Sequence, residues 1–439
     1  MIKGIKRGLI VFIIIALMGL LLVISMMAIA HPYNGKWKME AYGFCLDIKE
    51  GFVKTYEVTD HYYTRVKQYD GVIINGTLYC GLGKFKLVKD NEQLTLVDEG
   101  AQVVYQTNPQ AKSYFKDLIK VTETDSVLIF NMFYEILKEN YAFAEMYGVD
   151  FDAEYERYSP LVKKDTSGDM LYQYMCNMVV GLNDGHVYVN WKDKEYTPSD
   201  YKPDWAADKE QIDKIGYVVK NIYVKDYYKF KDCYIRYGTL REDIGYINIT
   251  AMGMKAFNKT ATSKNALDKI MKQLQNTKTL VIDLRFCGGG YDEASLMIAG
   301  YFTQNPYLAY HKQAYYKGEY TPLQDIYVKP CELNYNGNVV VLTSGYTVSA
   351  GENLLQALLA NPDQKIELVG EETAGYYSDS IPKLLPGGFC VGMSNERYFG
   401  ANDTMLEGKG FIPDVVIPLN VDDTEQGKDK AMDYVLEKY

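Results

Sequence analysis

The first pattern along the chain is an uninterrupted apolar run. Residues 8–30 contain no charged side chain and follow a basic flank at residues 3–7. A helix of about 20 apolar residues spans a bilayer, and a basic flank stays on the cytoplasmic side. We therefore predict a membrane anchor within residues 1–32, with the rest of the chain outside the cytoplasm. Because residues 28–30 also fit a signal-peptidase site, the alternative is cleavage after Ala30 and a secreted protein.

The next two stretches differ in the spacing of their apolar residues. Residues 33–108 alternate apolar and polar positions in short runs such as FCLDI and KTYEV. This period of two predicts a small antiparallel β-domain, a barrel or a sandwich. Residues 109–190 place apolar residues three and four apart, as in DSVLIFNMFYEILKEN, which predicts a helical subdomain.

The remaining residues combine a connection with alternating strands and helices. Residues 191–242 are polar and weakly patterned, and we interpret them as a connecting segment. Within residues 243–439, apolar strands such as TLVIDLR and VVVLTS alternate with amphipathic helices such as NALDKIMKQL. A β-rich stretch ending in FIPDVVIP follows. Such alternation is typical of a sheet covered by helices, so the chain is predicted to be a multidomain α/β protein with a layered core.

Composition narrows the range of partners. The chain has 47 basic and 57 acidic residues, and its net charge of -10 disfavours nucleic acid as a partner. Its seven cysteines are widely spaced and include no CxxC pair, which argues against a zinc site.

Ser349 lies where an apolar strand turns into a helix, in VVVLTSGYTVSAGENLLQALL. Unpaired N–H groups and the positive end of the dipole at a helix start favour a nucleophilic serine and a developing oxyanion. A serine that merely caps the helix is the alternative. The small neighbours Ala350 and Gly351 favour the nucleophile, because a substrate must approach closely there.

A glycine-rich loop, FCGGG at residues 286–290, follows another buried strand. Consecutive glycines let backbone N–H groups point at a ligand oxygen. An oxyanion hole, a phosphate cradle and a plain tight turn all fit this pattern. The phosphate alternative lacks the lysine and the spacing of a P-loop.

A nucleophilic serine needs a base, and the chain has four histidines. His186 lies in NDGHV, a turn before a strand, where its ring can be presented to a partner. A structural role is the alternative for any single histidine.

Five motifs in order give the chain a family resemblance: VIDLRFCGGG, TVSAGENLLQAL, VGEETAG, LPGGFCVG and EGKGFIPDVVIP. Together they resemble the C-terminal processing (tail-specific) serine peptidases over residues 112–420. The resemblance implies a crotonase-like (ClpP-like) layered core and hydrolysis of peptides. It also implies a serine nucleophile that requires no metal and no organic cofactor.

The family has two mechanistic branches, and the motifs favour one of them. In the serine–lysine branch a lysine follows the G-E-x-T-x-G motif, but here Tyr376 stands at that position. The other branch, similar to the tricorn protease core, carries a histidine in L-x-D-G-H and a glutamate before G-x-x-P-D. These match His186 and Glu407. The resemblance therefore implies Ser349 as nucleophile, His186 as base and Glu407 as the carboxylate that orients it.

The same resemblance implies an oxyanion hole built from backbone N–H groups. The donors would be Gly288 or Gly289 together with Ala350.

Three features depart from the pattern of relatives. Gly185 replaces a serine that relays between histidine and glutamate, so Asp184 is a second candidate for the orienting carboxylate. Cys287 replaces a common asparagine. Residues 191–242 are too few for the PDZ domain that many relatives carry.

The leading hypothesis is an extracytoplasmic serine endopeptidase acting on peptide or protein substrates. A catalytically silent peptide- or lipophile-binding module on the same fold is one alternative, because a fold alone does not fix function. An esterase or amidase using the same triad is another.

Overall fold

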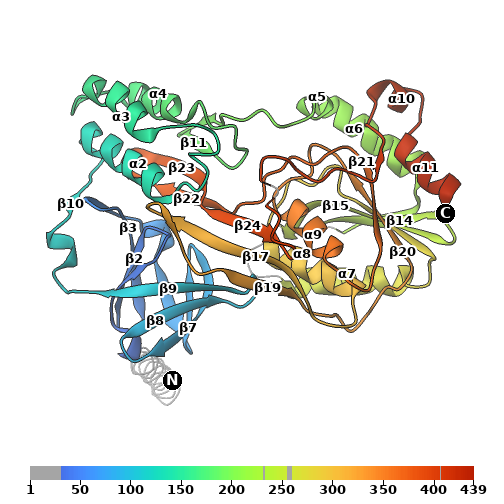
Figure 1. The fold of residues 1–439 in the computed structure, drawn as a ribbon, viewed down its shortest axis with the longest axis horizontal. Helices are drawn as coiled ribbons and strands as arrows, with labels where there is room; N and C mark the ends of the chain where they lie inside the picture. The colour runs from blue at the N-terminus through green and yellow to red at the C-terminus, as the bar shows by residue number, and fades with distance from the viewer. Residues whose placement is uncertain (1–30, 231–232, 255–259, 406) are drawn as a thin grey trace, which may run out of the picture.

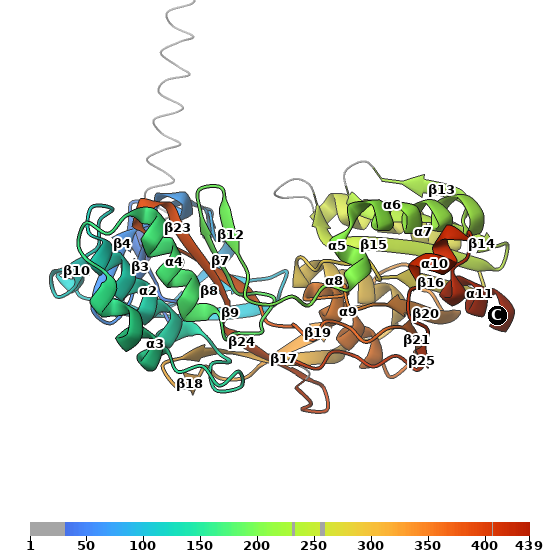
Figure 2. The same ribbon diagram turned by 90° about the horizontal axis from the view of Figure 1, so that it is seen from above.

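The computed structural model describes residues 31–230, 233–254, 260–405 and 407–439. These residues form two lobes joined by long strands (Figures 1 and 2). The predicted membrane segment, residues 8–30, lies outside the described residues. Within the described ranges no helix is long and apolar enough to cross a bilayer.

One lobe contains a closed antiparallel β-barrel near the N-terminus. Its strands are β1 (Gly35–Met39), β2 (Phe44–Lys49), β3 (Phe52–Val58), β5 (Gly71–Ile74), β6 (Thr77–Cys80), β7 (Gly83–Asp90), β8 (Gln93–Asp98) and β9 (Val103–Gln110). They follow the order β3-β2-β1-β9-β8-β7-β6-β5, and pairing of β3 with β5 closes the barrel. In β8, Leu94 and Leu96 point inward while their neighbours are more exposed, as the period of two predicted. Two short strands, β4 (Tyr62–Arg65) and β10 (Ile119–Lys120), extend the sheet beyond β3.

Three helices cover a small sheet in the same lobe. The helices are α2 (Ser126–Asn140), α3 (Phe151–Tyr158) and α4 (Gly168–Val179). Asp125, Asp150 and Ser167 cap their N-termini by accepting hydrogen bonds from backbone N–H groups. The sheet has the order β12-β11-β23-β22, with β11 (Tyr188–Trp191), β12 (Lys194–Tyr196), β22 (Ser380–Leu384) and β23 (Phe389–Ser394). The helices therefore pack on a sheet whose strands come from two distant parts of the chain, residues 188–196 and residues 380–394.

The second lobe is a seven-stranded sheet between two layers of helices. Its order is β13-β14-β15-β16-β20-β21-β25. The strands are β13 (Lys225–Lys229), β14 (Cys233–Arg241), β15 (Ile244–Met254), β16 (Thr279–Asp283), β20 (Asn338–Thr343), β21 (Ile366–Gly370) and β25 (Val415–Val416). The pairings from β15 to β25 are parallel. This layered α/β core confirms the predicted fold class.

The two faces of this sheet bury different helices. One face packs against α7 (Thr260–Leu274), α8 (Asp292–Ala299) and α9 (Ala350–Leu359). The other packs against α6 (Lys209–Val218) and the C-terminal α11 (Lys430–Lys438). Neither α11 nor the preceding α10 (Val421–Glu425) was predicted from the sequence, where this stretch was expected to be a β-rich tail.

Long strands connect the lobes. They are β17 (Tyr307–Tyr316) and its antiparallel partners β19 (Gln324–Val328) and β24 (Glu396–Gly400), with the short β18 (Glu319–Tyr320) at one end. A second connection, from β12 to α5 (Asp204–Ala207), also runs between the two lobes (Figure 2).

Candidate active site

Ser349 directly precedes α9, after the turn that follows β20. Its backbone has φ 59° and ψ −128°, a left-handed conformation that is uncommon for a residue with a side chain. Its N–H donates to the carbonyl of Tyr376 at 2.8 Å, and its own carbonyl accepts from Glu352 and Asn353 at 2.7 and 3.0 Å. The side chain makes no cap hydrogen bond. Ser349 is therefore held in a strained conformation without serving as a conventional N-cap.

The glycine loop lies directly against Ser349. A Cβ added to Gly289 would lie 2.7 Å from the Cβ and 3.2 Å from the Oγ of Ser349. A Cβ added to Gly290 would lie 2.0 Å from the carbonyl oxygen of Met252 on β15. These two approaches explain why the loop needs glycine at both positions.

The candidate oxyanion donors differ in their hydrogen bonds. The N–H of Gly288 donates to the carbonyl of Thr250 at 3.2 Å. Among the described residues, the N–H groups of Gly289 and Ala350 have no backbone acceptor, although a hydrogen bond from the N–H of Gly289 acts to lower the pKa of the Cys287 thiol. Two N–H groups without a backbone acceptor therefore flank Ser349, one on the loop beside it and one at the next residue.

His186 lies in the loop between α4 and β11, and its ring is partly enclosed. Its backbone N–H donates to Oδ1 of Asp184 at 2.8 Å. The ring Nδ1 is buried and has no hydrogen-bond partner among the described residues. Burial lowers the pKa of His186 below its usual 6.5, although the charges of Asp184 and Asp379 act in the opposite direction. The neutral imidazole, which can accept a proton, is therefore favoured.

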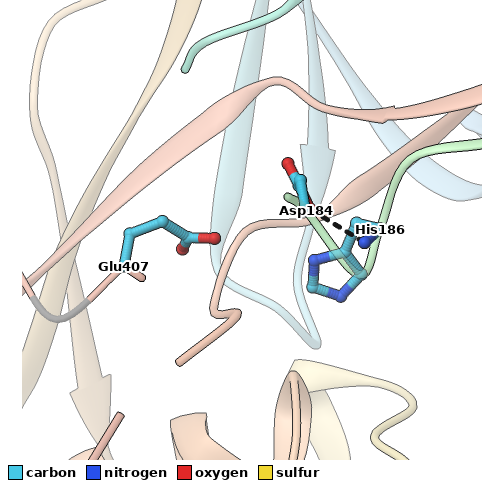
Figure 3. Close-up of side chains that lie close together, drawn as sticks. All are labelled: Asp184, His186 and Glu407. Carbon is cyan, nitrogen blue, oxygen red and sulfur yellow. Dashed lines mark hydrogen bonds between the residues drawn. The ribbon is translucent and has the colours of Figure 1, made fainter. Parts of the chain in front are cut away.

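Glu407 faces His186 from the other side of the site (Figure 3). Its Oε2 accepts from the backbone N–H groups of Tyr377 and Ser378 at 2.9 and 3.3 Å. Its Oε1 is buried and lacks a partner among the described residues. Burial, and then the negative charge of Asp184, raise the pKa of Glu407 well above its usual 4.5.

Asp184 completes a close group with these two side chains. One possible ligand atom from each of Asp184, His186 and Glu407 lies within 4.8 Å of the other two. Both oxygens of Asp184 are already bonded, because the hydroxyl of Tyr141 donates to Oδ2 at 3.0 Å. The carboxylate oxygen near His186 that has no partner among the described residues is therefore Oε1 of Glu407.

The same three side chains are the ones that could hold a metal ion, within the residues that the structure describes. Zinc sites in proteins use three or four protein ligands. Among the buried side-chain atoms of this group, Nδ1 of His186 and Oε1 of Glu407 lack a hydrogen-bond partner, whereas both oxygens of Asp184 accept hydrogen bonds.

Tyr376 connects the serine with the histidine. Its carbonyl accepts from Ser349, and its ring centre lies 6.4 Å from that of His186 with the planes at 74°. Its hydroxyl lies 2.8 Å from Oγ of Ser199 in the segment between β12 and α5. The structure therefore brings Ser349 and His186 to the same residue, but it contains no hydrogen bond between their side chains.

The ring of Tyr376 also explains the glycine before the histidine. A Cβ on Gly185 would lie 2.8 Å from Tyr376 and 3.0 Å from Tyr201. A serine at this position, as in the tricorn pattern, would collide with both rings. The aromatic residues thus take the space that a relay side chain would need.

Glu352 is a site residue that the sequence analysis missed. It is fully buried on α9, and its carboxylate accepts from the hydroxyl of Thr373 at 2.5 Å and from the N–H groups of Gly375 and Tyr376 at 2.9 and 2.8 Å. Burial raises its pKa to about 7, against these hydrogen bonds. A glutamate three positions after Ser349, on the same helix face, was the available signal.

Comparison with known proteins gives two family matches. The model of peptidase family S41 matches residues 243–417, and the model of the tricorn protease C1 domain matches residues 128–179. The first contains Ser349, the glycine loop and Glu407, and the second covers α2 to α4.

Solved structures share the fold. A putative peptidase from Parabacteroides merdae is 22% identical with a TM-score of 0.60, and the match covers 71% of this chain and 96% of that chain. Mature CPAF complexed with lactacystin is 12% identical with a TM-score of 0.53, covering 71% of this chain and 97% of that chain. The motifs, the fold and the two family matches agree, and the chain is a serine-type peptidase of family S41, the family of the C-terminal processing peptidases.

Proposed function

We propose that this peptidase cleaves peptide bonds through an acyl-enzyme on Ser349, with His186 as its general base. The observation that carries the proposal is the packing of Gly289 against Ser349. It sets a hydroxyl that makes no cap hydrogen bond beside two backbone N–H groups without a backbone acceptor among the described residues, those of Gly289 and Ala350. Such donors stabilise the oxyanion that forms when a hydroxyl attacks a carbonyl carbon.

In the first step His186 takes the proton of Ser349 as its oxygen bonds to the scissile carbonyl carbon. The tetrahedral oxyanion accepts hydrogen bonds from Gly289 and Ala350. His186 then returns the proton to the leaving amine as the C–N bond breaks. Water attacks the acyl-enzyme by the same route and releases the second product.

Glu407 is proposed to orient His186 through a hydrogen bond from Nδ1–H to Oε1. That bond would satisfy two buried atoms that now lack partners, and it leaves Nε2 as the basic atom. Burial disfavours the charge on Glu407, so its carboxylate is stabilised most when the neighbouring imidazole becomes positive. The arrangement therefore favours the proton transfer from Ser349.

We further propose that different segments of the chain supply the different catalytic groups. Residues 109–190 supply the base, and residues 243–439 supply the nucleophile and the oxyanion donors.

The apolar run at residues 8–30 supports a single-pass anchor with the peptidase outside the cytoplasm, or a secreted form if Ala30 is the cleavage site. Digestion of intact cells by an added protease tests the location, because an outward-facing domain is degraded while a cytoplasmic control protein survives.

A fluorophosphonate probe tests the nucleophile directly. We expect labelling of the full chain and none of Ser349→Ala, with much slower labelling of His186→Ala because the base is lost. Equal labelling of wild type and Ser349→Ala would refute the proposal. Turnover of matched peptide and ester substrates then separates a peptidase from an esterase with the same residues.

A further inference from the structure

One turn of the barrel is buried, unlike its other hairpin turns. Residues 40–43 join β1 to β2, and Ala41 and Tyr42 are 1% and 8% exposed. By contrast, Asn75 in the turn between β5 and β6 is exposed. The turn between β1 and β2 contacts β22, β24 and Asn395, which joins β23 to β24.

The backbone of this turn is fixed by side chains of the other strands. The fully buried ammonium of Lys383 donates to the carbonyl of Tyr42 and pairs with Glu57 of the barrel at 2.7 Å. Asn395 donates to the carbonyl of Ala41 at 3.3 Å. The bonds of this buried ammonium tie the turn and β3 to β22, while Oε2 of Glu57 has no partner among the described residues.

The side chain of Tyr42 continues toward the site. Its hydroxyl donates to Oε1 of Glu396 at 2.5 Å, and Oε2 of Glu396 pairs with Lys312 at 2.7 Å. Lys312 also binds Asp379 at 2.8 Å, and the N–H of Glu396 donates to Oγ of Ser378 at 3.2 Å. Ser378 is the last residue of the segment 376–378, whose backbone bonds to Ser349 and Glu407, and Asp379 directly follows it.

A second branch leads to the two helices beside the nucleophile. Lys312 donates to the hydroxyl of Tyr398 at 2.9 Å, and that hydroxyl donates to Asp292 at 2.8 Å. Asn353 donates to the other oxygen of Asp292 at 2.8 Å. Asp292 begins α8 just after the glycine loop, and Asn353 lies on α9 four residues after Ser349. The network therefore includes one residue on each of the two helices that follow the glycine loop and Ser349.

The hydrogen-bond network around Lys312 contains more carboxyl groups than ammonium groups. One ammonium, that of Lys312, serves three carboxyl groups, on Asp292, Asp379 and Glu396. Burial raises the pKa of Glu396 to about 7, although Lys312 acts to lower it. The hydroxyl of Tyr42 is a neutral donor to that carboxyl group, and a buried acceptor that loses its donor is costly.

We propose that Tyr42 of the barrel is a positioning residue for cleavage, holding residues 376–379 against Ser349 and Glu407 through Glu396 and Lys312. The barrel is then part of the catalytic machinery rather than a spacer. The proposal rests on Ser349 and Glu407 having the roles given above.

The test measures fluorophosphonate labelling of Ser349 in the full-length protein as a function of probe concentration. Tyr42→Phe keeps the ring and removes the hydroxyl. We expect its labelling rate constant at saturation to fall about 5- to 100-fold, the range for leaving a buried acceptor unpaired. The probe concentration for half-maximal rate should stay unchanged, because the probe-binding surface is intact.

Matched variants make the result specific. Tyr79→Phe alters an exposed tyrosine of the same barrel and should label like the wild type. Glu396→Gln should by itself lower the labelling rate constant at saturating probe. This variant replaces Tyr42→Phe in the test if Tyr42→Phe does not fold. The double variant should label no more slowly than Glu396→Gln alone, because both changes break the same link.

Two outcomes overturn the inference while leaving the proposed nucleophile in place. One is wild-type labelling of folded Tyr42→Phe at Ser349, and the other is an equal loss in Tyr79→Phe. Labelling that persists in Ser349→Ala would have a different meaning. It would refute the proposed role of Ser349 as nucleophile, and with it the proposed function.

Discussion

The two halves of the candidate site are built in different ways. The nucleophile half comes from adjacent stretches of the core lobe, with the Ser349 backbone bonded to Tyr376, Glu352 and Asn353 and with Gly289 in contact. The base half joins His186 and Glu407, which come from distant segments, and leaves Nδ1 and Oε1 without partners.

This difference indicates which half is preorganised. A strained serine backbone persists only when surrounding bonds hold it, so the nucleophile half is fixed before substrate arrives. In the base half, Nδ1 of His186 and Oε1 of Glu407 lack partners, and under the proposed mechanism a hydrogen bond between them completes the working arrangement. The following experiments break each half in turn.

Removal of the nucleophile should have the largest effect. Ser349→Ala is expected to lower kcat at least about 10⁴-fold, because no other hydroxyl can form the acyl-enzyme. Steady-state hydrolysis of a fluorescent peptide measures the loss, and an unchanged melting temperature excludes unfolding. Residual activity within tenfold of wild type would require another nucleophile.

The base half can be tested by comparing its two carboxylates. Glu407→Gln should lower kcat about 10²- to 10⁴-fold, because an amide N–H facing Nδ1 favours the wrong tautomer of His186. Asp184→Asn should cost less than tenfold, since Asp184 is already occupied by Tyr141 and by the backbone of His186. A larger loss in Asp184→Asn than in Glu407→Gln would make Asp184 the orienting carboxylate.

The glycine loop offers a matched pair in the nucleophile half. Gly289→Ala should lower kcat about 10²- to 10³-fold, the cost of a lost oxyanion donor, because its Cβ would lie 2.7 Å from that of Ser349 and its φ is +84°. Gly288→Ala should stay close to wild type, since the nearest atom to its Cβ would be 3.7 Å away. Equal losses in the two variants would contradict the assignment of Gly289.

The pH dependence separates His186 from an exposed histidine. Burial lowers the pKa of His186 from 6.5, whereas a hydrogen bond to Glu135 raises that of the exposed His61. Histidine NMR should therefore show His186 titrating below 6.5 and His61 above it. Below the pKa of His186, kcat/KM should fall about tenfold per pH unit, because protonation removes the base.

The same shift predicts the sign of a stability change. Between the lowered pKa of His186 and 6.5, the unfolded chain binds the proton while the folded chain does not. Proton binding at His186 therefore does not affect the free energy of unfolding above pH 6.5. As the pH falls below 6.5, it stabilises the unfolded chain and lowers that free energy. His186→Gln should reduce that acid destabilisation in chemical denaturation, and an unchanged dependence would contradict the assigned shift.

The smallest effect concerns backbone strain at Ser349. Glycine adopts a positive φ without a side-chain clash, so Ser349→Gly should be more stable than Ser349→Ala by about 1 kcal/mol. Urea denaturation of the two inactive variants measures the difference. A less stable glycine variant would show that the conformation of Ser349 is not strained.

Local sequence patterns predicted the layered core, the small antiparallel domain and the helical subdomain. Ser349 could be singled out because a strand, a turn and a helix start are encoded within a few residues. The motif resemblance also supplied His186 and Glu407 as candidates. Their roles remain predictions until the variants above are measured.

Other features could not be predicted because they depend on contacts between distant segments. Tyr376 was recognised only as the residue in place of a lysine, while its carbonyl and ring link Ser349 to His186. Nothing local marks Tyr42, since a tyrosine in a hairpin turn is ordinarily exposed. Pairing of β23 with β11, which completes the sheet of the helical lobe, also joins segments far apart in the chain.

The sequence by itself determined the antiparallel domain, the helical subdomain, the alternating strands and helices of the core and the family, because apolar period, turn residues and short motifs act over a few neighbouring positions. Only the tertiary structure decided which carboxylate has a free oxygen for His186, which glycine touches Ser349 and which barrel turn reaches the site. Those properties arise from packing and hydrogen bonding between segments whose order in the chain does not fix their distance in space.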